Sequence, residues 1–209
     1  MMLTRFLALA FLVIGLSACD SGGETGDGGP DIDARIVSDL PADPTVGVDS
    51  LGRPVGTGEA TFFDLSENAI VATADSASAD RDIALRATTS LENSGASGPG
   101  TASAQVVEGV FEDLLEAPVD GYTQDSAGGF AIPTGSGNGW YNYNFGLNLI
   151  TPVPGRILVV RTSDGLYAKI RILNYYLGAP ETIDPAVDES RYYTFEYVIQ
   201  YDGSRNFTE

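Results

Sequence analysis

The chain has 209 residues and a formal net charge of -18, from 29 acidic and 11 basic residues. Phosphate binding needs clustered positive charge, so this balance excludes nucleic acid as an expected partner. The sequence contains no His, which excludes Ser-His-Asp and Cys-His nucleophile systems and His-based zinc or iron sites.

The first 18 residues are predicted to be a lipoprotein signal peptide. A positive charge at Arg5 precedes an apolar run, residues 6–16, that is too short to span a bilayer but suits a signal core. The following "LSAC" resembles a bacterial lipobox, which makes Cys19 the predicted lipidation site and membrane anchor. The alternative is an ordinary secretory signal with an incidental Cys. Both methionines precede Cys19, so the mature chain would contain neither His nor Met.

Residues 19–58 are predicted to form an acidic tether rich in Gly, Asp and Pro. The stretch lacks sustained hydrophobic periodicity and carries too little apolar surface to offset the entropy of ordering it. Its Asp residues do not follow the spacing of an EF-hand loop, so no metal site is expected there.

Residues 59–209 are predicted to be one antiparallel all-β domain, either sandwich-like or open, with at most one short helix. Strands are expected at 60–65 and 68–73, joined by a short polar turn, and 81–87 is expected to be a half-buried strand. Residues 90–104 are expected to form a Gly- and Ser-rich loop. The spacing of apolar residues predicts the helix at 104–117.

The clearest hairpin is "RILVVRTSDGLYAKIRIL", with its turn at Asp164 and Gly165. In its second strand, Tyr167, Lys169 and Arg171 share one face, which predicts a buried apolar face and an exposed cationic one.

The segment "SRYYTFEYVIQYDGS" concentrates its aromatic rings on one face. Tyr193, Phe195, Tyr197 and Tyr201 fall on that face at a period of two. Such rings suit a pleated, half-buried surface, so core packing is favoured over ligand contact, most strongly at Phe195 and Tyr197.

With these blocks in order, the chain resembles the HmuY family of bacterial lipoproteins, which is linked to haem capture. The resemblance rests on the lipobox, "TFFDL", "DIALR", "NSGASGPG", "GWYNY", "PGRILVVRTSDGLYAKIRILNYY" and "ESRYYTFEYVIQYDGSRNF". It implies an antiparallel all-β fold, an outer-membrane or cell-surface location, and haem binding in partnership with a TonB-dependent outer-membrane receptor. Well-known members hold haem iron through paired His or paired Met side chains, so no axial ligand carries over to this mature chain.

Tyr is the remaining usual protein ligand for haem iron. The resemblance therefore directs attention to residues in or beside the second Gly-rich loop and to Arg residues that suit propionates. The candidate ligand contacts are Tyr122, Trp140, Tyr141, Tyr143, Arg161 and Arg171. A packed aromatic ring or a solvated cation is the alternative for each.

Two functions are compatible with these features. The first is a haem-binding or related hydrophobic-ligand lipoprotein; the second is a structural or interaction lipoprotein that has lost the axial ligands. No pair of carboxylates is singled out by its spacing, so an enzyme is not expected.

Overall fold

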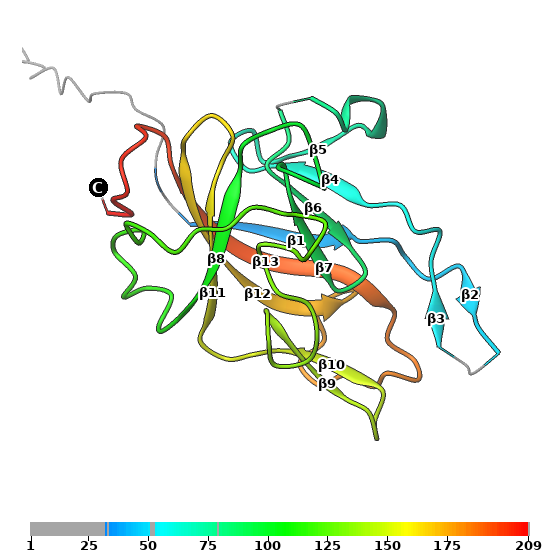
Figure 1. The fold of residues 1–209 in the computed structure, drawn as a ribbon. Coiled ribbons are helices and arrows are strands. Elements are labelled where there is room, and N and C mark those ends of the chain that lie inside the picture. Colours follow the sequence, from blue (N-terminus) through cyan, green and yellow to red (C-terminus); the bar gives the residue numbers. More distant parts are fainter. Residues whose placement is uncertain (1–31, 33, 51–52, 79, 209) are drawn as a thin grey trace, which may run out of the picture.

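The computed structural model describes residues 32, 34–50, 53–78 and 80–208, and these form an all-β, antiparallel sandwich. The larger sheet has the strand order β1 (Arg35–Pro41), β13 (Ser190–Gln200), β12 (Tyr167–Tyr176), β11 (Arg156–Arg161) and β8 (Ser103–Glu108) (Figure 1). The smaller sheet has the order β5 (Ala69–Val71), β4 (Thr61–Asp64), β6 (Ile83–Arg86) and β7 (Thr89–Glu92). The predicted fold class is confirmed.

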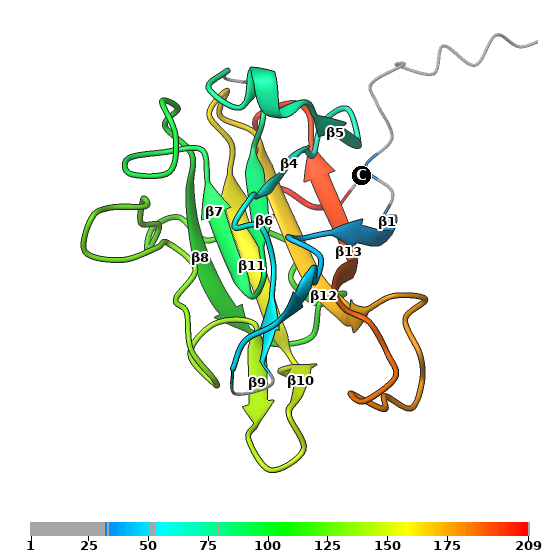
Figure 2. The same cartoon turned by 90° about the vertical axis from the view of Figure 1, so that its right-hand side faces the viewer.

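Two short hairpins extend from this sandwich. One is formed by β9 (Tyr141–Asn144) and β10 (Leu149–Pro152), and the other by β2 (Gly47–Val48) and β3 (Pro54–Val55). Figure 1 shows both extending away from the stacked sheets, and Figure 2 shows the β9–β10 hairpin at the lower end of the molecule. In the described residues, the only helical element is a single 3-10 turn, η1 (Thr73–Asp75), and no helix is long and apolar enough to cross a membrane.

The main core lies between the two sheets. On β13, Tyr193, Phe195 and Tyr197 are fully buried and face the smaller sheet, as their period of two predicts. The ring of Phe195 meets that of Phe63 on β4 edge to face, with centroids 5.7 Å apart. Aromatic pairs in this geometry add to the free energy gained from burial, so the rings of β13 hold the two sheets together.

A second apolar cluster covers the outer face of the larger sheet. Phe111 and Phe207, from the segment after β8 and the C-terminal segment, pack there on Ile157, Val159 and Val198. The predicted exposed cationic face is therefore wrong at Lys169, which is 4% exposed. Its Nζ donates to the backbone oxygens of Phe111 (2.7 Å) and Leu114 (3.0 Å), because the covering segment supplies the acceptors that a buried ammonium needs.

The expected helix at 104–117 is also wrong. Residues 103–108 form β8, which pairs with β11 along its length, and an irregular segment follows from Gly109. The β-branched pair Val106 and Val107 suits a strand that packs on both faces, and this packing outweighs the helical spacing of the later apolar residues.

The expected tether of residues 19–58 needs correction in its second part. Strand β1 pairs with β13, and the nearby Leu40 and Ala42 are buried in the main core, so the folded unit begins before residue 59. The apolar residues of this strand are interrupted by a bulge at Asp39, which has a φ of 54° and hides the alternation in the sequence. The predicted signal peptide and Cys19 lie outside the described residues.

Two of the remaining predicted strands and the predicted hairpin turn are present, and one strand differs in its burial. The strands at 60–65 and 68–73 correspond to β4 and β5, and the Asp164–Gly165 turn joins β11 to β12. Strand β6 is buried on both faces rather than one, because Ala84 and the preceding Asp82 are covered as well as Ile83 and Leu85.

Candidate ligand-binding cleft

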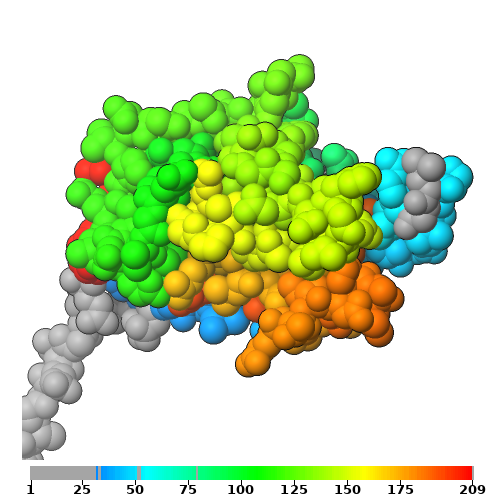
Figure 3. All heavy atoms as spheres, turned by 90° about the horizontal axis from the view of Figure 1, so that it is seen from below, coloured from blue at the N-terminus to red at the C-terminus, as the bar shows by residue number. Residues whose placement is uncertain are grey.

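The β9–β10 hairpin forms one wall of an open cleft. Its other wall is the connection between β12 and β13, and the cleft has a volume of about 530 Å³. The lining residues come from 146–149 and from 183–186, and we call this space the hairpin cleft. Figure 3 shows the hairpin and the β12–β13 connection side by side on the same face of the molecule.

A smaller pocket of about 200 Å³ adjoins the hairpin cleft and shares Asn148 and Pro185 with it. We call it the inner pocket. It reaches from the hairpin to the turn after β6 and to the start of β13, and its lining includes Tyr175, Tyr176 and Arg191. The two spaces together combine an apolar mouth with a more polar inner end, which is the usual composition of a small-molecule site.

The hairpin presents apolar side chains beside the cleft. Phe145 and Leu147 are 87% and 61% exposed, and the ring of Phe145 contacts that of Tyr143 edge to face at 6.3 Å. The Tyr143 hydroxyl donates to Oδ1 of Asn148 at 3.0 Å, so it borders the cleft through a residue that lines it. Exposed apolar side chains of this size gathered in one place are typical of binding surfaces.

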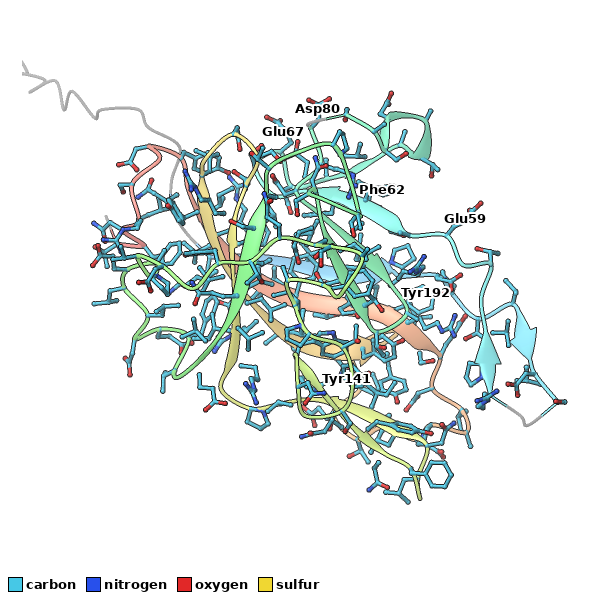
Figure 4. All side chains as sticks on the ribbon, in the orientation of Figure 1. Glu59, Phe62, Glu67, Asp80, Tyr141 and Tyr192 are labelled. Carbon is cyan, nitrogen blue, oxygen red and sulfur yellow. The ribbon has the colours of Figure 1, made fainter. Side chains whose placement is uncertain are left out.

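The base of the hairpin is fixed by a cluster of buried rings. Trp140 is 2% exposed, its ring packs on those of Tyr175 and Tyr193 at 5.6 and 5.0 Å, and its Nε1 donates to the backbone oxygen of Thr88. Tyr141 is buried next to it and lies where the hairpin joins the body of the protein (Figure 4). These two candidate residues therefore position the hairpin, and the cleft lies further out.

The hydroxyl of Tyr176 ties the hairpin to β12. It accepts the backbone N–H of Ile150 at 3.1 Å, and Tyr176 itself lines the inner pocket. Burial raises the pKa of Tyr176, and the negative charge of Asp188, another lining residue, raises it further. Like an ordinary phenol, Tyr176 is protonated at neutral pH, so its own proton is available as a donor. The raised pKa makes that proton harder to remove.

Arg191 supplies the positive charge of the inner pocket. Its Nη1 donates to the backbone oxygen of Asp43 and forms an ion pair with Asp43 Oδ2 at 3.1 Å, while Nη2 donates to the backbone oxygen of Pro54. Arg191 adopts a φ of 73°, a conformation that side-chain-bearing residues rarely take and that often marks a functional site. These contacts hold the β2–β3 arm beside the pocket.

The remaining sequence-predicted candidates lie elsewhere, on the outer face of the larger sheet. Tyr122 packs edge to face on Tyr167, its buried hydroxyl has no hydrogen-bond partner among the described residues, and burial raises its pKa to about 12. The Arg161 guanidinium lies over the ring of Tyr167, 5.8 Å from its centroid. Arg171 pairs with Glu196 and Glu112. The structure therefore does not bring the six candidates into one site.

Sequence reasoning missed Tyr176, Arg191, Phe145 and Leu147. Two of these had a usable signal, because Phe145 and Leu147 are large apolar residues in a turn rich in Asn and Gly. Tyr176 and Arg191 had none, because their positions depend on the bulges at the end of the β12–β13 pairing. In the described part of the chain, no group of three or more His, Cys, Asp or Glu side chains is arranged to hold a metal ion.

Comparisons with known proteins give only distant structural likenesses. No protein-family model and no curated protein sequence matches the chain. A candidate HmuY-like heme-binding protein from Bacteroides vulgatus superposes with a TM-score of 0.48 and 15% identity, covering 81% of this chain and 93% of that one. A candidate lipoprotein from Bacteroides fragilis gives a TM-score of 0.43 and 13% identity, with 74% and 95% covered.

The apo form of the HmuY analog from Tannerella forsythia gives a TM-score of 0.38 and 14% identity, with 81% of this chain and 95% of that chain covered. Likenesses at this level do not assign the chain to a family, so its function is argued from its own residues.

Proposed function

We propose that this protein is an extracytoplasmic, lipid-anchored binding protein whose hairpin cleft takes a flat hydrophobic ligand of the haem type. The observation that carries the proposal is the group of exposed apolar side chains, Tyr143, Phe145 and Leu147, beside an open cleft on a chain of charge -18. Apolar side chains of this size are unfavourably exposed to water on such an acidic surface unless something covers them. We therefore assign them as the contact surface for a ligand.

The sequence resemblance to the HmuY family favours haem over other flat ligands. It also suggests that Cys19 carries the lipid, that the protein faces outward from an outer membrane, and that a TonB-dependent receptor receives the ligand. We propose binding and transfer as its role, with no catalytic step.

The residues around the two pockets suit a haem-type ligand. With neither His nor Met in the mature chain, the iron would take a Tyr oxygen, for which Tyr176 in the inner pocket and Tyr143 beside the cleft are available. Propionates would lie toward the guanidinium of Arg191 and the hydroxyl of Ser190, which both line the inner pocket. An iron-bound phenolate would require Tyr176 to lose its proton on binding.

The test is a titration of the chain from Asp20 onward, which contains the whole described core, with haemin. We expect a saturable shift of the Soret band. Replacing both Phe145 and Leu147 by Ala should weaken binding by at least tenfold, because both apolar side chains beside the cleft are lost. Val119→Ala is the control, since Val119 is 78% exposed and lines neither the hairpin cleft nor the inner pocket.

The axial ligand is tested separately with Tyr176→Phe and Tyr143→Phe. The variant that removes the ligand should lose the phenolate-to-iron charge-transfer band, while the other retains it. A featureless titration, or an equal loss in Val119→Ala and the double variant, would defeat the haem proposal.

A second candidate function is an interaction lipoprotein that binds no haem. The absence of His and Met from the mature chain favours it, and the same exposed hairpin would then contact a protein. Co-purification of a TonB-dependent receptor with ligand-free protein, together with a featureless haemin titration, would support this function over the first.

A further inference from the structure

A second groove opens on the outer side of the larger sheet. It lies between the segment after β8, the β10–β11 connection and the middle of β12, with a volume of about 460 Å³. None of its lining residues belongs to the hairpin cleft or to the inner pocket. We call it the outer groove.

The outer groove combines an apolar lining with two of the ten Arg residues. Val110, Pro152, Val153, Ile172 and Leu173 supply much of the lining, and Val110 and Leu173 are exposed. Arg156, Arg171 and the carboxylate of Glu112 also line the groove. On a chain with 29 acidic residues, two guanidinium groups at one apolar groove make a local site for an anion with a hydrocarbon body.

Both Arg side chains keep donors available for a ligand. Arg171 uses Nε and Nη2 for Glu196 and Glu112, and Arg156 uses Nη1 for Glu108 and Nη2 for the backbone oxygen of Gly137. Within the described part of the chain, neither Nη1 of Arg171 nor Nε of Arg156 makes a hydrogen bond or ion pair.

The two outermost carboxylate partners are weakly held. Glu112 and Glu108 are 60% and 76% exposed, and water screens ion pairs at such exposure, so each pair contributes little to stability. An incoming carboxylate can therefore replace Glu112 at Arg171, whereas Glu196, which is 16% exposed, stays paired and keeps the guanidinium in place.

The lining favours an aliphatic chain over a flat ring. Phe111 is the one aromatic residue of the lining. Its ring already contacts two cations, with the Arg171 guanidinium 4.7 Å and the Lys169 ammonium 4.5 Å from the ring centroid. A flat ligand would therefore find no free ring to stack on, while an alkyl chain needs only the apolar surface of the Pro, Val and Leu residues.

We propose that the outer groove binds the free carboxylate of a medium- or long-chain fatty acid, with Arg156 and Arg171 holding the head group and the aliphatic residues holding the chain. This site is independent of the haem-type ligand proposed for the hairpin cleft.

The test measures the binding of dodecanoate, labelled with ¹³C at the carboxyl carbon and kept below its micelle concentration, to the chain from Asp20 onward. We expect one saturable site, seen as a shifted carboxyl resonance. Arg156→Gln and Arg171→Gln should each weaken binding at least tenfold. Arg161→Gln is the matched control, because Arg161 is an exposed Arg on the same sheet outside the groove, and it should change binding less than twofold.

Further arms separate this site from its alternatives. Leu173→Ser leaves both Arg residues intact and should still weaken binding, which keeps the test valid if Arg171→Gln unfolds the protein. Dodecanol should bind at least tenfold more weakly than dodecanoate, and so should a lysophospholipid with the same chain. Equal binding of the alcohol, or of the lysophospholipid, would overturn the proposed recognition of a free carboxylate.

The hairpin variant distinguishes the two proposals from each other. Replacing Phe145 and Leu147 by Ala should leave dodecanoate binding unchanged while weakening haemin. If this variant abolishes dodecanoate binding, the fatty acid occupies the hairpin cleft and the outer-groove proposal is wrong. If haemin never binds but dodecanoate does, the outer groove stands without the haem proposal.

Discussion

The hydroxyl of Tyr193 donates a 2.8 Å hydrogen bond to the backbone oxygen of Ala87. Tyr193 lies on β13 of the larger sheet, and Ala87 follows β6 of the smaller one, so the bond joins the two sheets beside the inner pocket. The neighbouring Thr88 oxygen accepts the Nε1 proton of Trp140 in the same way. Two rings that pack against each other at a tilt therefore hold one turn, and this turn forms a wall of the pocket.

Tyr193→Phe should lower the free energy of unfolding by about 1–2 kcal/mol, because the carbonyl of Ala87 loses its side-chain partner while the packed ring remains. The measurement is chemical denaturation. Tyr192→Phe is the control on the same strand, since its hydroxyl makes only an exposed 3.3 Å bond to Glu189, and it should cost less than about 0.5 kcal/mol. Equal losses in the two variants would contradict the role given to the inter-sheet bond.

Replacing Gly95 by Ala should destabilise the protein more than replacing Gly165 by Ala, although both glycines have a positive φ. A Cβ there would lie 1.7 Å from the backbone oxygen of Asp125, whereas at Gly165, in the β11–β12 turn, it would meet nothing within 4 Å. Gly165→Ala should cost about 1–2 kcal/mol from backbone strain alone. Gly95→Ala should cost clearly more, because its loop must also move away from Asp125. Thermal melts of both variants decide this, and similar melting temperatures would contradict it.

Glu92 should make the protein less stable as the pH rises toward 8. It is fully buried, Ser90 donates to its Oε1, and its Oε2 has no partner among the described residues. Burial, and then the charge of Asp125, raise its pKa from 4.5 to about 8. The native state thus keeps a proton that the unfolded state loses near pH 4.5. The stability from this group is complete below that pH and is lost as the pH rises through 8.

The variant Glu92→Gln tests this sign. Its neutral amide has no proton to lose, so the free energy of unfolding should fall less steeply between about pH 5 and pH 8.5 than in the parent protein. Glu67→Gln removes an exposed carboxyl from the β4–β5 turn of the same smaller sheet and should leave the parent slope unchanged. Parallel pH profiles for the parent and Glu92→Gln would show that Glu92 is not the group responsible.

The large negative charge predicts stabilisation by salt. At -18, the carboxylates repel one another across the surface, and near the end opposite the β9–β10 hairpin Glu67 and Asp80, labelled in Figure 4, line the same pocket as Asp64, Asp82 and Asp164. Salt screens this repulsion, so the melting temperature should rise between dilute buffer and about 1 M NaCl. A melting temperature that stays constant over this range would contradict the predicted stabilisation by screening.

Local patterns were enough to predict much of the fold. The aromatic period of two on β13, the Asp164–Gly165 turn and the β4–β5 hairpin all depend on neighbours within a few residues, and all three appear as expected. Strand β1 was missed because its pairing with β13 spans more than 150 residues and its bulge at Asp39 breaks the alternation. The helix predicted at 104–117 failed because long-range pairing with β11 decided the local conformation.

The candidate site also combines properties that the sequence determines with properties that only the fold determines. Composition alone established that this chain has no His, carries a strong negative charge and is rich in Tyr, and these properties exclude whole classes of chemistry regardless of folding. Only the tertiary structure decided which rings are buried and which border a cleft, because Trp140 and Tyr143 are three residues apart yet lie in the core and at the surface. The burial of a side chain depends on which distant parts of the chain pack against it, and the residues next to it in the sequence do not determine this.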